Sequence, residues 1–192
     1  MRRNRGFTLI EISIVIVIIG LLIAGVIKGT SLIQSAKVSN AITLAQDISV
    51  AVNAFKQQYH MLPGDMSINS TTPEIPNVTC PSVVSLATAN NGLIDKLPES
   101  QCVPEMLFKA GLAKEPAFNS YYGPVSVKAV GLTTVSGFAP SVTHVVEFAN
   151  LPCEVAQEMD RRMDNDDLAS GKAIASVTNC TAGTPVFYAV AL

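Results

Sequence analysis

The sequence predicts an α+β fold, in which a long N-terminal helix packs against a small antiparallel sheet formed later in the chain. Three observations lead to this prediction. An apolar run covers residues 7–27, residues 31–59 contain neither proline nor glycine, and runs rich in β-branched and aromatic residues begin only after residue 120. Helices and strands that are segregated along the chain in this way are typical of α+β folds.

The apolar run has the length and composition of a membrane-spanning helix. About 20 residues, each rising 1.5 Å, cover a hydrocarbon core of roughly 30 Å. Arg2, Arg3 and Arg5 precede the run and Lys28 follows it. Because positive charge stays on the cytoplasmic side, we expect a cytoplasmic N-terminus and translocation of everything after the run.

Three interpretations of this N-terminus compete. A secretory signal peptide has a shorter apolar core that ends at a small-residue cleavage site, and no Ala-x-Ala closely follows this run. A plain signal anchor accounts for the length but not for Glu11, the only charged residue in the run. Inside a membrane helix, a carboxylate costs on the order of 2.5–3.5 kcal/mol. The third interpretation places cleavage on the cytoplasmic side of the run, after Gly6.

Residues 5–11, which read Arg-Gly-Phe-Thr-Leu-Ile-Glu, resemble the class III signal of type IV pilins and type II secretion pseudopilins. The resemblance implies a pilin-like fold and cleavage between Gly6 and Phe7 by a prepilin peptidase, which also N-methylates Phe7. It further implies assembly through the N-terminal helix, with Glu11 neutralising the terminal amine of a neighbouring subunit. Pairing is also what makes a buried carboxylate tolerable in an apolar environment. The alternative is that Glu11 merely reaches the membrane interface.

This resemblance divides the chain into three parts. Residues 1–6 are the leader, residues 7–30 are the transmembrane and assembly half of the helix, and residues 31–192 are a periplasmic or extracellular head that includes the rest of the helix. The expected partners are other copies or other pilins, the prepilin peptidase and methylase, and an inner-membrane assembly platform. The chain is then stored in the bacterial inner membrane before it enters a periplasmic or extracellular filament.

The second half of the helix carries one apolar stripe. Its members recur at spacings of three and four, which is the period of an amphipathic helix. The sequence Leu-Pro-Gly-Asp at residues 62–65 then ends the helix. The stripe, which predicts where the head packs, consists of Ala41, Ala45, Ile48, Val52, Phe55 and Tyr59.

The remainder of the head mixes irregular segments with short elements. Residues 66–123 are expected to be irregular apart from one short helix over residues 104–112, which Pro104 would begin. Strands are expected over residues 125–130, 143–148 and 186–190. A helix is expected over residues 152–163. These strands would form an antiparallel sheet against the second half of the long helix.

Residues 164–167, which are Asp164, Asn165, Asp166 and Asp167, form an acidic cluster directly after that helix. Calcium takes several carboxylate and carbonyl oxygens, so this cluster is a candidate calcium site. The spacing matches no EF-hand loop, and a solvated turn explains it equally well. We therefore expect no cofactor and keep calcium at residues 164–167 as the alternative.

Four cysteines, Cys80, Cys102, Cys153 and Cys180, all follow the apolar run. An even number in a translocated domain favours disulfides, and four cysteines allow three connectivities. We expect Cys80–Cys102 and Cys153–Cys180, because each pair closes one loop-rich region. The second loop would resemble the C-terminal disulfide-bounded region of many type IV pilins.

Composition and motifs argue against catalysis and against direct nucleic-acid binding. The chain has a formal charge of −2 and no basic stripe. It contains two histidines, His60 and His144, and none of the usual hydrolase, zinc-protease or phosphate-loop motifs. The predicted function is a structural subunit of a type IV pilus-like filament for adhesion, motility or DNA uptake. The alternatives are a type II secretion pseudopilin and a solitary membrane-anchored periplasmic binding domain.

Overall fold

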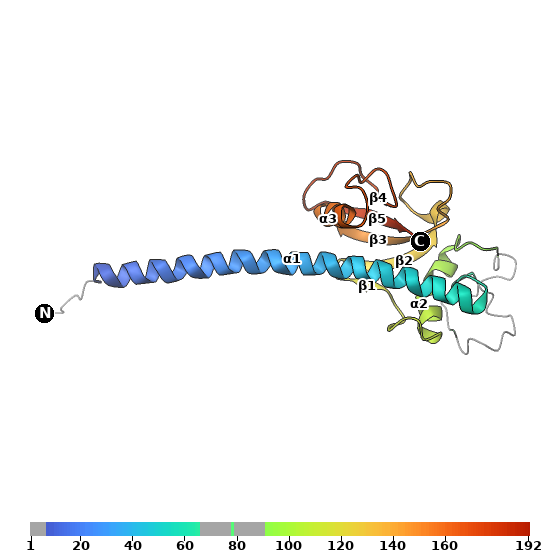
Figure 1. Ribbon diagram of the computed structural model, residues 1–192, viewed down its shortest axis with the longest axis horizontal. Coiled ribbons are helices and arrows are strands. Elements are labelled where there is room, and N and C mark those ends of the chain that lie inside the picture. Colours follow the sequence, from blue (N-terminus) through green and yellow to red (C-terminus); the bar gives the residue numbers. More distant parts are fainter. Residues whose placement is uncertain (1–6, 66–77, 79–90) are drawn as a thin grey trace. The chain divides into compact units, whose positions relative to one another are not determined.

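The computed structural model describes residues 7–65, residue 78 and residues 91–192. It divides into two compact units, Met1–Lys37 and Val38–Leu192. One helix, α1 (Leu9–Tyr59), belongs to both units, and every later element belongs to the second (Figure 1). The long helix, the antiparallel sheet and the short helices confirm the predicted pilin-like α+β arrangement.

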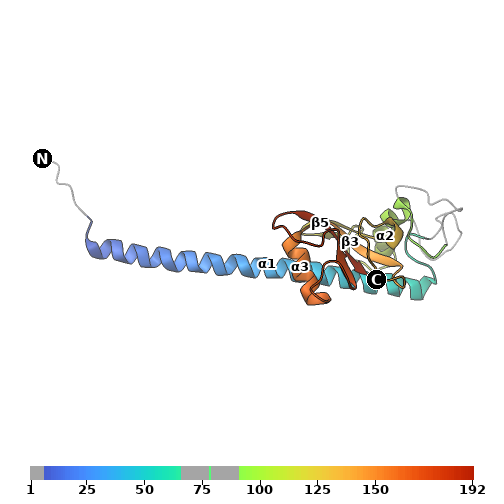
Figure 2. The ribbon, with the colours of Figure 1, turned by 90° about the horizontal axis from the view of Figure 1, so that it is seen from above.

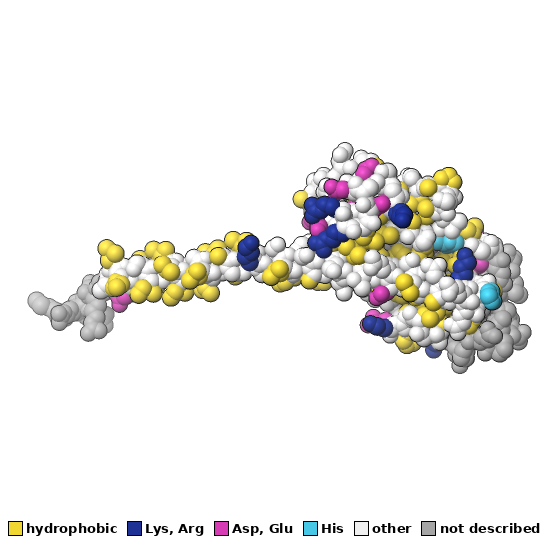
Figure 3. Space-filling view, viewed as in Figure 1, with side chains coloured by type: hydrophobic (Ala, Val, Ile, Leu, Met, Phe, Trp, Pro, Cys, Tyr) yellow, Lys and Arg dark blue, Asp and Glu magenta, His cyan; other side chains and the backbone are white. Residues whose placement is uncertain are grey.

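The first unit is the apolar part of α1. Its large apolar side chains are exposed; Leu9 is 89% exposed and Leu32 is 72% exposed. Figure 3 shows these hydrophobic side chains along the helix. Within the described residues, α1 is the one helix that is long and apolar enough to cross a membrane. A helix that is apolar around its whole circumference needs a membrane or other helices to cover it.

The second unit begins where α1 acquires a buried face. Only the side chains on one stripe are buried, because residues three and four apart lie on the same side of a helix. Tyr59 is half-buried, and the centroid of its ring lies 4.5 Å from that of Phe55. The buried residues of this part of α1 are Val38, Ala41, Ala45, Ile48, Ala51, Val52 and Phe55, which confirms the predicted stripe.

The turn after α1 requires glycine at one position. Gly64 has φ +92°, and a Cβ atom there would collide with the carbonyl oxygen of Glu99 and approach a methyl group of Val103 to 2.9 Å. The Gly64 N–H group also lies 3.0 Å from the sulfur of Met106. Gly64 therefore allows the chain leaving α1 to pass against the next helix, α2 (Leu97–Lys109).

The expectation that a helix begins at Pro104 is wrong, because α2 begins seven residues earlier. Pro98 occupies the first helical turn and Pro104 lies inside the helix. The Glu99 carboxylate accepts the N–H group of Lys96 at 3.0 Å and so caps the start. At the other end, Gly111 has φ +73°, and the Leu112 N–H group donates to the Leu107 carbonyl at 2.9 Å in a Schellman motif.

Within the described residues, the sheet has five strands in the order β1-β2-β3-β5-β4, and every neighbouring pair is antiparallel. The predicted strands correspond to β2, β3 and β5, whereas the sequence analysis did not predict the two short edge strands. A 3₁₀ helix, η1 (Val130–Leu132), follows β2. The strands are β1 (Asn119–Ser120), β2 (Gly123–Ala129), β3 (His144–Pro152), β4 (Ala173–Ala175) and β5 (Pro185–Ala191).

Successive side chains along each strand point to opposite faces of the sheet, and both faces are buried. Val146 and Phe148 of β3 and Tyr188 of β5 join the main core, together with the buried stripe of α1 and residues of α2. Val145 and Ala189 point to the other face, where they form a smaller cluster. Figures 1 and 2 show the sheet beside the second half of α1.

Helix α3 (Cys153–Met163) completes the main core and lies within one residue of the predicted bounds. Val155, Ala156 and Met159 are buried on its inner face. Asp160 is also buried, and its Oδ1 atom accepts a hydrogen bond from the Tyr188 hydroxyl at 3.3 Å. Helix α3 thereby connects the end of β3 to the middle of β5.

Candidate functional site

The candidate site is the start of α1, where the sequence predicts processing and assembly. Gly6 lies outside the described residues. Phe7 precedes the helix with 84% of its side chain exposed, and Glu11 lies in the first helical turn. The structure therefore places Phe7 and Glu11 about one turn apart on an open helix end.

Thr8 and Glu11 form a capping box around this end. The Glu11 Oε2 atom accepts the Thr8 N–H group and the Thr8 hydroxyl, each at 2.7 Å. In return, the Glu11 N–H group donates to Thr8 Oγ1 at 3.3 Å. These bonds satisfy backbone N–H groups that an α-helix leaves unpaired at its start.

The contribution of Thr8 was not predicted from the sequence, where Glu11 was interpreted only as a charge in need of a partner. A Thr-x-x-Glu sequence just before an apolar run is the usual signal of a capping box. The structure shows that the carboxylate also begins the helix, where a negative charge interacts favourably with the helix dipole.

The arrangement leaves Glu11 able to bind a cation. Its carboxylate accepts both hydrogen bonds from Thr8 through Oε2, so Oε1 is the oxygen through which a second partner can approach. Among the described residues, no ion pair involves Glu11. A charged amine from outside the chain is therefore a partner of the right sign and size for this position.

In the head, Cys153 and Cys180 form a disulfide, with their Cα atoms 5.4 Å apart. This is the second of the two expected pairs. It ties the start of α3 to the loop that precedes β5. Cys102 is fully buried in α2, but Cys80 lies outside the described residues, so the pair Cys80–Cys102 stays a prediction.

The acidic cluster after α3 closes a loop. Asp164 Oδ2 accepts the N–H groups of Lys172 and Ala173, the second at 3.0 Å. Asp167 accepts the Ser170 hydroxyl at 2.7 Å and the Ala169 N–H group at 3.1 Å. The bond from Ser170, followed by that from Ala169, holds the pKa of Asp167 below its usual value. Over the described ranges, no group of three or more His, Cys, Asp or Glu side chains is placed to hold a metal ion.

The two histidines lie in different environments. His60 is exposed directly after α1, whereas His144 is buried at the start of β3. The Nδ1 atom of His144 lies 2.9 Å from the Thr143 hydroxyl, and in the part of the chain that the structure describes neither histidine has a metal-ligand cluster beside it. We therefore take the start of α1 as the candidate site.

Comparison with known proteins supports the start of α1 as the candidate site. Residues 1–27 match the family model described as the prokaryotic N-terminal methylation motif. No curated protein and no solved structure gives a significant match to the chain. The match covers Gly6, Phe7, Thr8, Glu11 and the apolar run, and it stops before the head.

Proposed function

We propose that this chain, which carries the class III prepilin signal of type IV pilins and pseudopilins, is a structural subunit of a type IV pilus-like filament. It is made as a prepilin, cleaved after Gly6, N-methylated at Phe7 and assembled through α1. The observation that carries the proposal is the match at residues 1–27, joined to a helix whose apolar side chains are exposed as far as residue 33.

The exposed part of α1 supports assembly on energetic grounds. Each large apolar side chain that leaves water contributes about 1.5–3 kcal/mol. The membrane covers these side chains while the chain is stored, and the α1 helices of other subunits cover them in a filament. Both environments suit the same helix, which allows a subunit to pass from one to the other.

The capping box supports the proposed role of Glu11. In a dry bundle of helices, an unpaired carboxylate costs several kcal/mol. Cleavage after Gly6 creates an amine on Phe7, and this amine on an adjoining subunit supplies the positive charge. Thr8 holds the carboxylate by Oε2, so the amine approaches Oε1. This contact would set the stagger between subunits.

The pseudopilin of a type II secretion system is the second candidate, because its precursor carries the same signal. In that case the filament is short and pushes substrates out of the periplasm. Within either proposal, the chain has a structural role and no catalysis. Its partners are other copies or other pilins, the prepilin peptidase and methylase, and the assembly platform of the inner membrane.

Mass spectrometry of the native host tests these proposals. A mature chain that begins with N-methylated Phe7, recovered in sheared surface filaments, supports the pilus subunit. A processed chain that stays in the cell envelope, with a secretion defect in its deletion strain and normal pili, supports the pseudopilin. An uncleaved chain that begins at Met1 and occurs in no filament would overturn both and favour a solitary membrane-anchored domain.

A further inference from the structure

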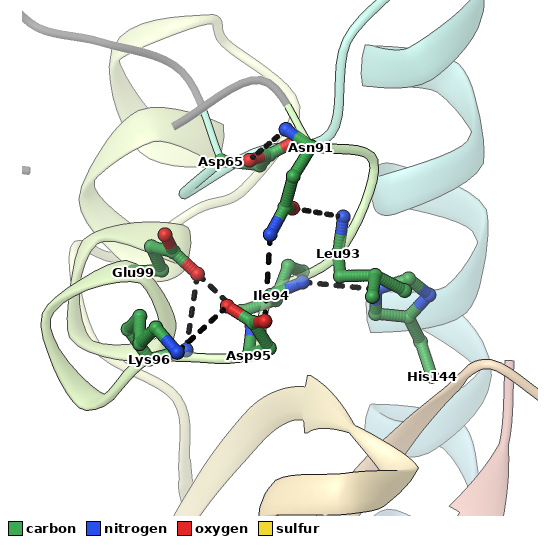
Figure 4. Close-up of polar contacts among 8 residues, drawn as sticks. All are labelled: Asp65, Asn91, Leu93, Ile94, Asp95, Lys96, Glu99 and His144. Carbon is green, nitrogen blue, oxygen red and sulfur yellow. Dashed lines mark hydrogen bonds and ion pairs between the residues drawn. The ribbon is translucent and has the colours of Figure 1, made fainter. Parts of the chain in front are cut away.

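Residues 91–96, here called the tether segment, are fixed to the head through three titratable side chains (Figure 4). Each of these side chains accepts hydrogen bonds from backbone N–H groups of the segment. Asp65 accepts from Asn91 at 3.1 Å and Gly92 at 2.8 Å, His144 accepts from Ile94 at 3.1 Å, and Glu99 accepts from Asp95 at 2.9 Å and Lys96 at 3.0 Å.

The bond to His144 depends on the protonation state of the imidazole. Its Nε2 atom faces the N–H group of Ile94, so Nε2 must carry a lone pair. The Nδ1 atom lies 2.9 Å from the Thr143 hydroxyl and carries the single proton of the neutral ring. The ring is buried, with 7% of the residue exposed.

Ile94 is the residue that this bond holds in place. Its side chain is fully buried in the main core. Its carbonyl accepts the N–H group of Ala129 at 2.8 Å, and Ala129 is the cross-strand partner of His144. The backbone of Ile94 is thus bonded on both sides to the same end of the β2–β3 pair.

We propose that His144 is a pH-sensitive latch for the tether segment. The neutral ring accepts the Ile94 N–H group and keeps the Ile94 side chain in the core. Protonation turns Nε2 into a second donor, which then faces the Ile94 N–H donor. The bond is lost, and the segment separates from the β2–β3 end.

The surroundings of His144 shift this event to a lower pH than for an ordinary histidine. Burial is the main cause that lowers the pKa of His144, and Lys56 on α1 lowers it further, whereas Asp65 acts in the opposite direction. The folded chain therefore binds fewer protons than the unfolded chain. The stability contributed by the neutral ring is present above its ordinary pKa of about 6.5 and is lost as the pH falls below that value.

The hydrogen bonds of Glu99 keep the start of α2 in place when Ile94 is released. Its Oε2 atom accepts both N–H groups, whereas its Oε1 atom is buried without a hydrogen-bond partner in the described structure. Burial is the main cause that raises the pKa of Glu99, with Asp95 and Asp65 adding to it. A proton on Oε1 leaves Oε2 free to accept, so the cap of α2 survives conditions that release Ile94.

Hydrogen exchange of the full-length chain in detergent micelles tests the latch. Mass spectrometry follows peptides from the tether segment and from the buried half of α1 between pH 7.5 and pH 4.5, after correction for intrinsic rates. In the same samples, C2-hydrogen exchange of the imidazole gives the titration of His144. The variants are His144→Gln, whose amide oxygen accepts without titrating, and His60→Gln as the matched control.

We expect His144 to titrate below the ordinary histidine pKa of about 6.5. Between about pH 6.5 and its midpoint, protection of the tether segment should fall by up to about tenfold per pH unit, while α1 stays protected. The fall should be absent in His144→Gln and unchanged in His60→Gln. Protection of the segment that does not follow the His144 titration in the wild-type chain would overturn the proposal. An equal fall in His144→Gln would also overturn it, as would simultaneous loss of protection in α1.

Discussion

At the scale of single residues, the start of α1 combines two tasks in few side chains. Glu11 accepts two hydrogen bonds from Thr8 and is the negative charge in an apolar helix. The same carboxylate can therefore begin the helix and meet the terminal amine of another subunit. Gly6, which precedes Phe7, is the residue that the proposed peptidase must approach.

Replacing Gly6 by valine should block processing. Glycine has no side chain, so its backbone can approach the catalytic groups of a peptidase closely, whereas a β-branched residue holds them away. We expect Gly6→Val to accumulate as the full-length precursor in the membrane, without filaments. N-terminal sequencing measures this result. The matched change Arg5→Lys keeps the charge and should be processed normally, and a mature N-terminus at Phe7 in Gly6→Val would contradict the prediction.

The variant Asp160→Asn should show how much the buried carboxylate of Asp160 destabilises the head. Burial is the main cause that raises the pKa of Asp160, so its folded form binds protons more readily than its unfolded form. The wild-type chain should therefore gain stability as the pH falls through that raised pKa, and the gain should be complete below the ordinary aspartate pKa of about 3.9. Asp160→Asn keeps an oxygen for the Tyr188 hydroxyl and should be more stable than the wild type at pH 7.

Pulse proteolysis across this pH range measures both effects in the full chain. The advantage of Asp160→Asn should shrink as the pH is lowered, because the wild-type carboxyl becomes neutral. Asp47→Asn, at an exposed position of α1, is the control and should change little. A lower stability of Asp160→Asn at pH 7 would show that the charge of Asp160 stabilises the head.

At the scale of elements, close contacts between segments far apart in sequence hold the head together. The turn after α1 passes against α2 at Gly64, and the disulfide joins α3 to the loop before β5. Each contact fixes a short element in place. Such positions are sensitive because the neighbouring backbone has no room to move.

Gly64→Ala should destabilise the head by more than about 2 kcal/mol, through positive φ and overpacking together. The added Cβ atom meets the carbonyl oxygen of Glu99, which belongs to a helix and cannot shift cheaply. Gly183→Ala is the matched control, since Gly183 also has a positive φ but no atom within 4 Å of an added Cβ. Equal losses for the two variants in pulse proteolysis would refute the close contact at Gly64.

The four cysteines of the native chain should form two disulfides that do not cross. Non-reducing peptide mapping of the processed protein should find Cys153–Cys180 and Cys80–Cys102. Cys153→Ser should lower the free energy of unfolding by about 2–5 kcal/mol, which is typical for a native disulfide of a small secreted domain. A crossed pair, such as Cys80–Cys180, would refute the predicted connectivity.

At the scale of the whole molecule, the two units face different environments. Met1–Lys37 offers exposed apolar side chains, whereas Val38–Leu192 has its own core of one helix stripe, a sheet and two further helices. Exposed apolar side chains of this kind need a membrane or other helices to cover them. Under the proposed function, the second unit folds after translocation.

Glu11 variants separate the two roles of this carboxylate in assembly. Glu11→Gln keeps an acceptor for Thr8 but loses the charge, and Glu11→Leu loses both. Both variants should be inserted and cleaved, yet both should give few filaments, because the amine of Phe7 then has no anionic partner. Thr8→Val is the matched control: it loses about 1 kcal/mol of helix capping but keeps the charge.

Filament yield relative to the cleaved membrane pool measures these effects, in a strain without a wild-type copy. We expect Thr8→Val to assemble better than either Glu11 variant. Undiminished filaments from Glu11→Gln would rule out charge pairing. A subunit at a filament tip has no neighbour above it, so a weak effect in both Glu11 variants would indicate that position.

The sequence by itself determined the features that depend on local pattern. Charge and hydropathy give the membrane-length helix, spacing gives the buried stripe as far as Phe55, and β-branched runs give β2, β3 and β5. The signal at residues 5–11 predicts the processing site. These features are readable because the side chains that encode them lie close together along the chain.

Only the tertiary structure decided the features that depend on distant partners. Pro104 looks like the start of a helix, but Pro98 and the Glu99 cap begin α2 earlier. The short strands β1 and β4 have little pattern of their own and exist because longer strands pair with them. The environment of His144 depends on Ile94, which lies 50 positions away, so no local pattern predicts that its ring must stay neutral.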